Sequence, residues 1–127
     1  MEAVAIVTII ALAQYVFFAI QVGAMRAKHG VNAPAVTGHQ EFERMFRIQQ
    51  NTMEQLVAFI PALWIFAWLV NPLWGAGFGV VFIIGRFIYW SSYRKDPASR
   101  GAGFTITFLP TVVMLVWSLI DAVWSYL

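Results

Sequence analysis

The sequence predicts an all-α integral membrane protein, a single domain over residues 1–127 built as a bundle of four transmembrane helices. Hydrophobic residues make up 61% of the chain and charged residues only 11%, which is too apolar for a soluble globular domain. The apolar residues gather in four runs. Each run is long enough to cross the roughly 30 Å hydrocarbon layer of a bilayer as a helix of about 20 residues. The connections are short and leave no room for a soluble module.

The expected helices cover about residues 3–25, 53–70, 73–93 and 104–127, and the second is expected to begin near residue 41. All eight Lys and Arg residues fall in or beside the first and third connections. By the positive-inside bias, these two connections are expected to face the cytoplasm. Both termini and the uncharged turn at residues 71–72 are then expected on the opposite side of the membrane.

The first apolar run is expected to remain as a helix, because Glu2 precedes it, its positive charges follow it, and it is too long for a signal peptide. Within it, Gln14 and Gln21 share a face and are expected to form hydrogen bonds between helices. His29 and His39 lie in the connection that follows, with no other good ligand nearby. They are expected to be ordinary surface residues, and no metal is expected.

Polar side chains continue into the second helix on one stripe. At about 100° per residue, the stripe comprises Glu43, Arg44, Arg47, Gln50, Asn51 and Glu54. Ionisable residues at membrane depth cost at least roughly 2.5 kcal/mol each on insertion scales, so they normally face a bundle interior or a water-filled cavity. The stripe therefore predicts one wall of a binding site.

The third helix predicts a second polar wall. Offsets of three, four and seven residues return to the same side of a helix, and one such face carries Arg86, Tyr89, Trp90 and Tyr93. Arg86 lies roughly 12 Å inside Arg94 along the helix axis. A guanidinium at that depth needs an anion, which Glu54 or a ligand carboxylate could supply. A third cationic group, Arg100, stands just ahead of the fourth helix, where the positive end of the helix dipole adds to its charge.

Small residues and prolines predict how the helices pack. Gly75 and Gly79 have the small-xxx-small spacing of close helix contacts, which is a better explanation for them than a phosphate-binding loop. Pro61 and Pro110 fall inside the second and fourth helices. A kink is expected at each, because proline removes a backbone hydrogen bond and crowds the preceding turn.

The excess of positive charge around the two walls favours an anionic ligand with several carboxylates and an ammonium group. Two alternatives stay open at this point. One is an ion-pair network, Arg47 or Arg86 with Glu54, that only fixes packing; the other is a small transporter that uses the charged stripe as its path. The chain has no cysteine, so any thiol chemistry must come from a ligand.

The run 42–54, FERMFRIQQNTME, together with Arg86, Tyr89, Tyr93 and Arg100, resembles the MAPEG family, the membrane-associated proteins in eicosanoid and glutathione metabolism. The resemblance covers essentially the whole chain and is nearest to the microsomal glutathione transferases and the leukotriene-forming synthase. It implies a homotrimer that binds glutathione between subunits, near the cytoplasmic side. The implied activity is glutathione transfer, in which the thiol is activated as a thiolate for attack on a lipophilic electrophile.

The resemblance also implies roles for individual residues. Arg100 stands where the family places the arginine that stabilises the thiolate. The expected glutathione contacts are Arg26, Arg47, Gln49, Asn51, Glu54, Arg86, Tyr89 and Tyr93. Gln55 and Ala27 depart from the family pattern, one replacing an aromatic residue and the other the second arginine of a tandem pair. Both departures weigh against leukotriene synthesis and not against glutathione binding.

Glutathione as co-substrate, a lipophilic electrophile and membrane lipid are thus the expected partners, and neither a metal nor a nucleic acid is expected. Glutathione-dependent peroxidase activity stays open as an additional activity. A non-enzymatic lipid-binding or regulatory member of the same fold stays open as well, although the presence of Arg100 argues against it.

Overall fold

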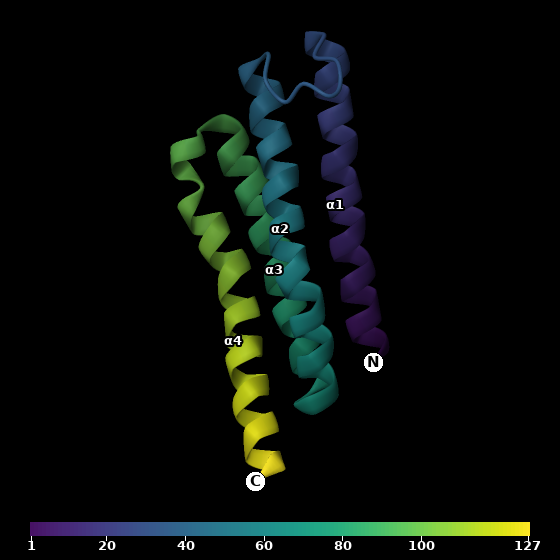
Figure 1. The fold of residues 1–127 in the computed structure, drawn as a ribbon, viewed down its shortest axis with the longest axis vertical. Helices are drawn as coiled ribbons and strands as arrows, with labels where there is room; N and C mark the ends of the chain where they lie inside the picture. The colour runs from purple at the N-terminus through teal and green to yellow at the C-terminus, as the bar shows by residue number, and fades with distance from the viewer.

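The computed structural model describes all 127 residues and confirms the four-helix architecture. The elements are α1 (Glu2–His29), α2 (Gln40–Leu69), α3 (Pro72–Lys95), the short 3-10 helix η1 (Pro97–Ser99) and α4 (Gly101–Tyr126). Consecutive helices run in opposite directions, so the α1–α2 and α3–α4 connections meet at one end of the bundle and both termini lie at the other (Figure 1). All four helices are long and apolar enough to cross a membrane.

Helix ends follow local capping chemistry. Gly30 ends α1 in the left-handed conformation, with φ 66°, and its N–H donates to the carbonyl of Arg26. His39 accepts a hydrogen bond from the N–H of Glu41 at the start of α2, and Asn71 does the same for Trp74 at the start of α3. The helices therefore extend beyond the predicted apolar runs: α1 continues to residue 29 and α4 begins at residue 101. The apolar runs mark the bilayer-spanning part of each helix rather than its ends.

Two apolar clusters fill the bundle. The larger one includes Phe59 and Phe82, whose rings stack with 3.9 Å between centroids. The smaller one, toward the connections, includes Phe18, Phe42 and Tyr89. Between the helices, Gln14 Nε2 donates to the carbonyl of Ile83 at 3.0 Å, which confirms the interhelical bond predicted for that residue. The side chain of Gln21 makes no hydrogen bond within the chain, so the bond predicted for it is not formed here.

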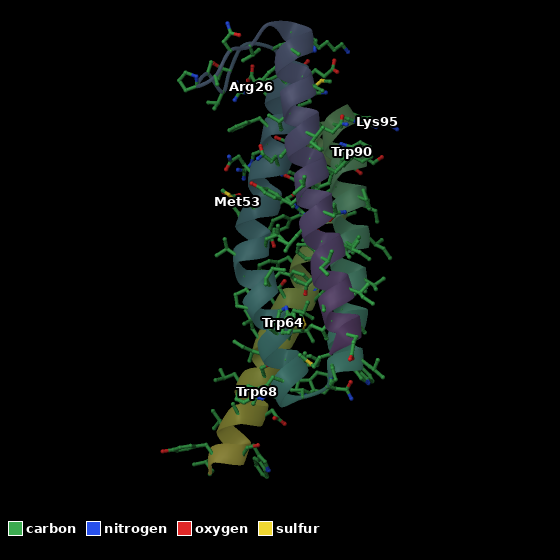
Figure 2. All side chains as sticks on the ribbon, turned by 90° about the vertical axis from the view of Figure 1, so that its right-hand side faces the viewer. Arg26, Met53, Trp64, Trp68, Trp90 and Lys95 are labelled. Atoms are coloured by element: carbon green, nitrogen blue, oxygen red, sulfur yellow. The ribbon has the colours of Figure 1, made fainter.

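The outer faces of the bundle are strongly apolar. Ile9 and Ile20 on α1 are 65% and 63% exposed, and Leu119 on α4 is 64% exposed. Soluble monomers rarely expose continuous apolar surface on this scale. Tryptophans lie toward both ends: Figure 2 shows the exposed Trp68 of α2 away from the α1–α2 and α3–α4 connections, and the partly buried Trp90 of α3 nearer to them. These are the levels at which aromatic side chains meet the water–lipid interface.

Glycines let α3 approach its neighbours. A Cβ atom at Gly79 would overlap the side chain of Val7 on α1, and one at Gly75 would lie 3.3 Å from Leu63 Cδ1 on α2. The predicted close packing at these two glycines is therefore confirmed. Pro61 and Pro110 lie inside α2 and α4, which continue through them. A bend at either proline stays a prediction.

The same kind of contact joins α3 to α4. A Cβ atom at Gly85 would lie 2.7 Å from the backbone nitrogen of Thr107, and one at Gly103 would overlap the backbone of Tyr89. The two helices can approach this closely only because both positions lack a side chain. The contact fixes the start of α4, and with it Arg100, against the face of α3 that carries the tyrosines.

Candidate functional site

A pocket of about 500 Å³ lies between α2, α3 and the start of α4. This volume is within the range of about 300–1,000 Å³ that is typical of small-molecule sites. Its lining consists of Arg47, Asn51, Tyr89, Tyr93, Arg100 and Phe104. Five of the nine residues singled out from the sequence thus come together. The lining carries two guanidinium groups and no carboxylate, so the pocket favours an anion.

Each of the three helices supplies a pair of residues four positions apart. Helical residues with this spacing are neighbours on one face. The pairs are Arg47 and Asn51 on α2, Tyr89 and Tyr93 on α3, and Arg100 and Phe104 around the start of α4. The two tyrosine rings stack, with 5.4 Å between centroids and 10° between planes. Both tyrosines line the same pocket.

At the edge of the pocket, Arg47 Nη1 and Glu54 Oε1 form an ion pair at 3.3 Å. Their side chains are 49% and 52% exposed in the single chain. Exposed pairs contribute only about 0–1 kcal/mol. One form of the ion-pair alternative is therefore present, but it is too weak and too exposed to account for the packing of the bundle. A ligand can open this pair at little cost.

Arg86 does not line the pocket but lies directly behind it. Its side chain is fully buried. Instead of meeting Glu54, it donates hydrogen bonds to neutral acceptors, among them Asn51 Oδ1 at 2.8 Å and Thr107 Oγ1 at 3.0 Å. Its guanidinium carbon lies 4.3 Å from the centroid of the Tyr89 ring. No carboxylate of the chain pairs with this arginine, and hydroxyl and amide oxygens accept hydrogen bonds from most of its donors.

Two further expected contacts also lie outside the pocket. Arg26, near the 30–39 connection (Figure 2), donates to the carbonyls of Val31 at 3.4 Å and Ala35 at 2.7 Å. Gln49 Nε2 donates to the hydroxyl of Tyr15 on α1 at 3.3 Å. Of the nine residues expected at the site, four therefore lie outside the pocket lining of the single chain: Arg26, Gln49, Glu54 and Arg86.

Sequence reasoning missed three residues around the site. Phe104 lines the pocket, and its spacing of four from Arg100 could have revealed it. Thr52 and Thr107 hold Arg86 from α2 and α4, at 3.1 and 3.0 Å. Thr107 lies in a largely apolar helix, which was the available signal for it, whereas Thr52 lies among the other polar residues of α2. Nothing in the sequence indicated that these two hydroxyls accept hydrogen bonds from Arg86.

The expected surface histidines meet each other in the first connection. The rings of His29 and His39 stack with 3.5 Å between centroids. Glu41 lies beside them, with Oε2 3.4 Å from His29 Nε2, and it also pairs with Lys28 at 3.2 Å. The cluster joins the end of α1 to the start of α2 and lies outside the pocket.

Four membrane-length helices with a basic pocket at the end that carries the connections define an integral, multi-pass membrane protein. The MAPEG family model matches residues 4–120, and the chain belongs to the MAPEG family. The resemblance drawn from the motifs at residues 42–54 and 86–100 is thereby confirmed.

Known proteins resemble the chain over most of its length. An uncharacterized protein of Synechocystis sp. is 39% identical over 121 residues, covering 95% of this chain and 88% of its own. Microsomal glutathione S-transferase 2 of Homo sapiens is 42% identical over 103 residues, covering 81% of this chain and 70% of its own. Leukotriene C4 synthase of Cavia porcellus is 31% identical over 96 residues, covering 76% and 64%.

Proposed function

We propose that the protein is a membrane glutathione transferase, in which the pocket binds glutathione and holds its sulfur as a thiolate for attack on a lipophilic electrophile. The observation that carries the proposal is the lining of the pocket. Two arginines, one amide and two phenols converge there from three helices, with no carboxylate among them. The relationship to microsomal glutathione S-transferase 2 supports the choice of ligand.

The chemistry of glutathione matches these side chains. It presents two carboxylates, one ammonium group and one thiol. Arginine binds carboxylates through paired, charge-assisted hydrogen bonds, and amide and phenol groups can add further donors. Arg47 and Asn51 are the proposed carboxylate partners on α2, and Tyr89 and Tyr93 are the proposed donors on α3. Glu54, beside Arg47, is the natural acceptor for the ammonium group.

Arg100 is the proposed catalytic residue. The thiolate is the nucleophile, and a free thiol has a pKa of about 8.5, so little thiolate forms at neutral pH without help. Arg100 precedes α4, where its charge adds to the positive end of the helix dipole. Within the chain its side chain makes only one long hydrogen bond of 3.4 Å, from Nη1 to the carbonyl of Pro97. Its remaining donors are free to hold a sulfur anion, which then forms a bond to the electrophilic carbon as the leaving group departs with its electron pair.

An apolar path supports the proposed entry of the electrophile from the bilayer. Phe104 lines the pocket, and Phe108 follows it one turn further along α4. The two rings stack with 5.7 Å between centroids, and Phe108 is 45% exposed on the outer face of the helix. A lipophilic molecule can therefore reach the sulfur along α4 without crossing the polar loops.

We further propose that three copies assemble and complete each site. Arg47 and Glu54 are half exposed in the single chain, and large apolar faces of α1 and α4 lack a covering partner. Symmetric assembly would cover both kinds of surface. Native mass measurement in mild detergent should give a trimer. A stable monomer that binds glutathione with full affinity would contradict the assembly while leaving the ligand assignment intact.

Arg100→Ala tests the proposed activity. We expect turnover with glutathione and a small electrophile to fall roughly ten- to hundredfold, the usual effect of losing a charge-assisted hydrogen bond, with a smaller change in glutathione affinity. Without the arginine, the thiolate forms only as the pH approaches the ordinary thiol pKa, so activity should recover as the pH rises. Arg100→Lys should fall between the two, because the charge remains without the planar fork.

The measurement is the ultraviolet absorbance of the thiolate, titrated against pH with bound glutathione. Lys95→Ala is the matched control, since it removes one positive charge from the same end of the bundle but not from the pocket. Superimposable titration curves for wild type and Arg100→Ala would remove Arg100 from the mechanism.

A further inference from the structure

Arg86 presents a chemical problem that the proposed roles leave unsolved. It is 0% exposed, and no ion pair of the chain includes it. A buried cation without a counter-charge is costly, so it normally persists only where its donors are well satisfied or where it serves a function. Here Nε and Nη1 are satisfied by Thr107, Asn51 and Thr52, while Nη2 has no partner at all.

The bond to Asn51 determines which way round the amide of Asn51 points. A guanidinium has only donors, so the atom of Asn51 that lies 2.8 Å from Arg86 Nη1 must be the carbonyl oxygen. The NH₂ group of the same amide is then turned away from Arg86. It donates to no atom of the chain, yet it is not among the fully enclosed unpaired atoms. Since Asn51 lines the pocket, this NH₂ group reaches the space where the ligand lies.

Arg86 holds a second lining residue from the same side. Its guanidinium carbon lies 4.3 Å from the centroid of the Tyr89 ring, a cation–π contact that restrains the ring. The acceptors for Arg86 come from α2 and α4, while Arg86 itself belongs to α3. One side chain therefore ties together the three helices that form the pocket.

We propose that Arg86 is a positioning residue of the glutathione site. It locks the Asn51 amide so that its NH₂ group, and not its carbonyl oxygen, faces an anionic group of the ligand, and it does so without touching the ligand. Without Arg86, both orientations of the amide are open, and the wrong one presents an acceptor to an anion. Arginine is suited to this position because its rigid fork serves several acceptors at once, whereas a lysine is a single point charge.

This proposal rests on the proposed function and is tested with glutathione itself, by calorimetry on the full-length protein in detergent. Asn51→Asp is the decisive variant. An aspartate keeps an acceptor for Arg86 but replaces the NH₂ donor with a second oxygen. We expect at least a tenfold loss of glutathione affinity with no loss of thermal stability.

A double-mutant cycle then tests whether Arg86 acts through Asn51. Arg86→Met should weaken glutathione binding about tenfold in the wild-type background and less than twofold once Asn51→Ala is present. Arg86→Lys should restore part of the affinity. Gly79→Ala, which crowds Val7 far from the pocket, is the stability control: it should lower the unfolding temperature and leave affinity within twofold.

Each outcome has one meaning. If the affinity losses of Arg86→Met and Asn51→Ala multiply in the double variant, or if folded Asn51→Asp binds glutathione with full affinity, the positioning role is overturned. The proposed function is left standing in both cases. If the Arg86 variants fail to fold, Asn51→Asp decides alone. A wild-type protein that binds no glutathione would overturn the proposed function, and the positioning role with it.

Discussion

At the scale of single residues, the site contrasts two kinds of arginine. Arg47 is half exposed and makes an ion pair that solvent weakens, whereas Arg86 is enclosed and holds its neighbours through short bonds. An exposed charge can change partners when a ligand arrives, but an enclosed one cannot without leaving polar groups unpaired. Ligand contact is therefore assigned to Arg47, and preorganisation to Arg86.

Removing either member of the exposed pair should weaken glutathione binding. Arg47→Ala deletes a carboxylate partner and Glu54→Ala deletes the acceptor for the ammonium group. Each loss should cost about 1.5 to 3 kcal/mol, roughly ten- to hundredfold in affinity by calorimetry. Arg44→Ala is the matched control, because Arg44 donates to the last carbonyls of α3 and not to the pocket. Unchanged affinity in folded Arg47 and Glu54 variants would refute their assignment.

At the scale of helices, the geometry of the pocket depends on how closely α4 approaches α3. Thr107 reaches Arg86 only because Gly85 leaves room for the backbone of α4. Gly103 allows the same approach one turn earlier, beside Tyr89. The position of Arg100 over the pocket is therefore a consequence of helix packing and not of the loop that carries it.

Gly103→Ala should separate the two helices. The added methyl group would overlap the backbone of Tyr89, which cannot move aside as a flexible side chain could. Overpacking of this kind costs typically about 1–3 kcal/mol, so the unfolding temperature followed by circular dichroism should fall together with glutathione affinity. Gly101→Ala adds the same methyl group two residues earlier, where nothing lies within 4 Å. It should be neutral, and equal effects of the two substitutions would show that helix spacing does not control the site.

Sequence reasoning succeeded where the bilayer itself imposes the constraint. The lengths of the apolar runs predict four helices, and the placement of the Lys and Arg residues predicts that the first and third connections lie on the same side. Both features could therefore be predicted without coordinates. It also placed Arg47 and Asn51 on one face of a helix, because that depends only on helical periodicity. It could not distinguish a lining arginine from one behind the lining. The environment of Arg86 depends on Thr107, which belongs to a different helix whose rotation is set by close contacts at glycines.

At the scale of the whole molecule, both cationic connections lie at one end of the bundle and both termini at the other (Figure 1). The pocket lies toward the connections. The side of the membrane on which the pocket lies therefore depends on the orientation of the chain. The positive-inside bias predicts that the pocket faces the cytoplasm.

Cysteine labelling can test this orientation cleanly, since the chain has no cysteine of its own. Ser99→Cys, in η1, should react with a membrane-impermeant reagent added from the cytoplasmic side only. Ser125→Cys, near the end of α4, is its matched partner and should react from the opposite side only. The reverse pattern would place the pocket on the non-cytoplasmic side of the membrane.

The enclosed position of Arg86 also bears on how the protein is made. During synthesis, α3 must enter the bilayer with this arginine before Thr107 of α4 has emerged to receive one of its hydrogen bonds. An arginine at the centre of a spanning segment costs about 2.5–3.5 kcal/mol for insertion, and α3 and α2 are the least apolar of the four helices. We therefore expect α2 to stabilise the nascent third segment first, through Asn51 and Thr52. We expect stable integration of α3 to be completed when α4 supplies Thr107, which would couple the last three helices during biogenesis.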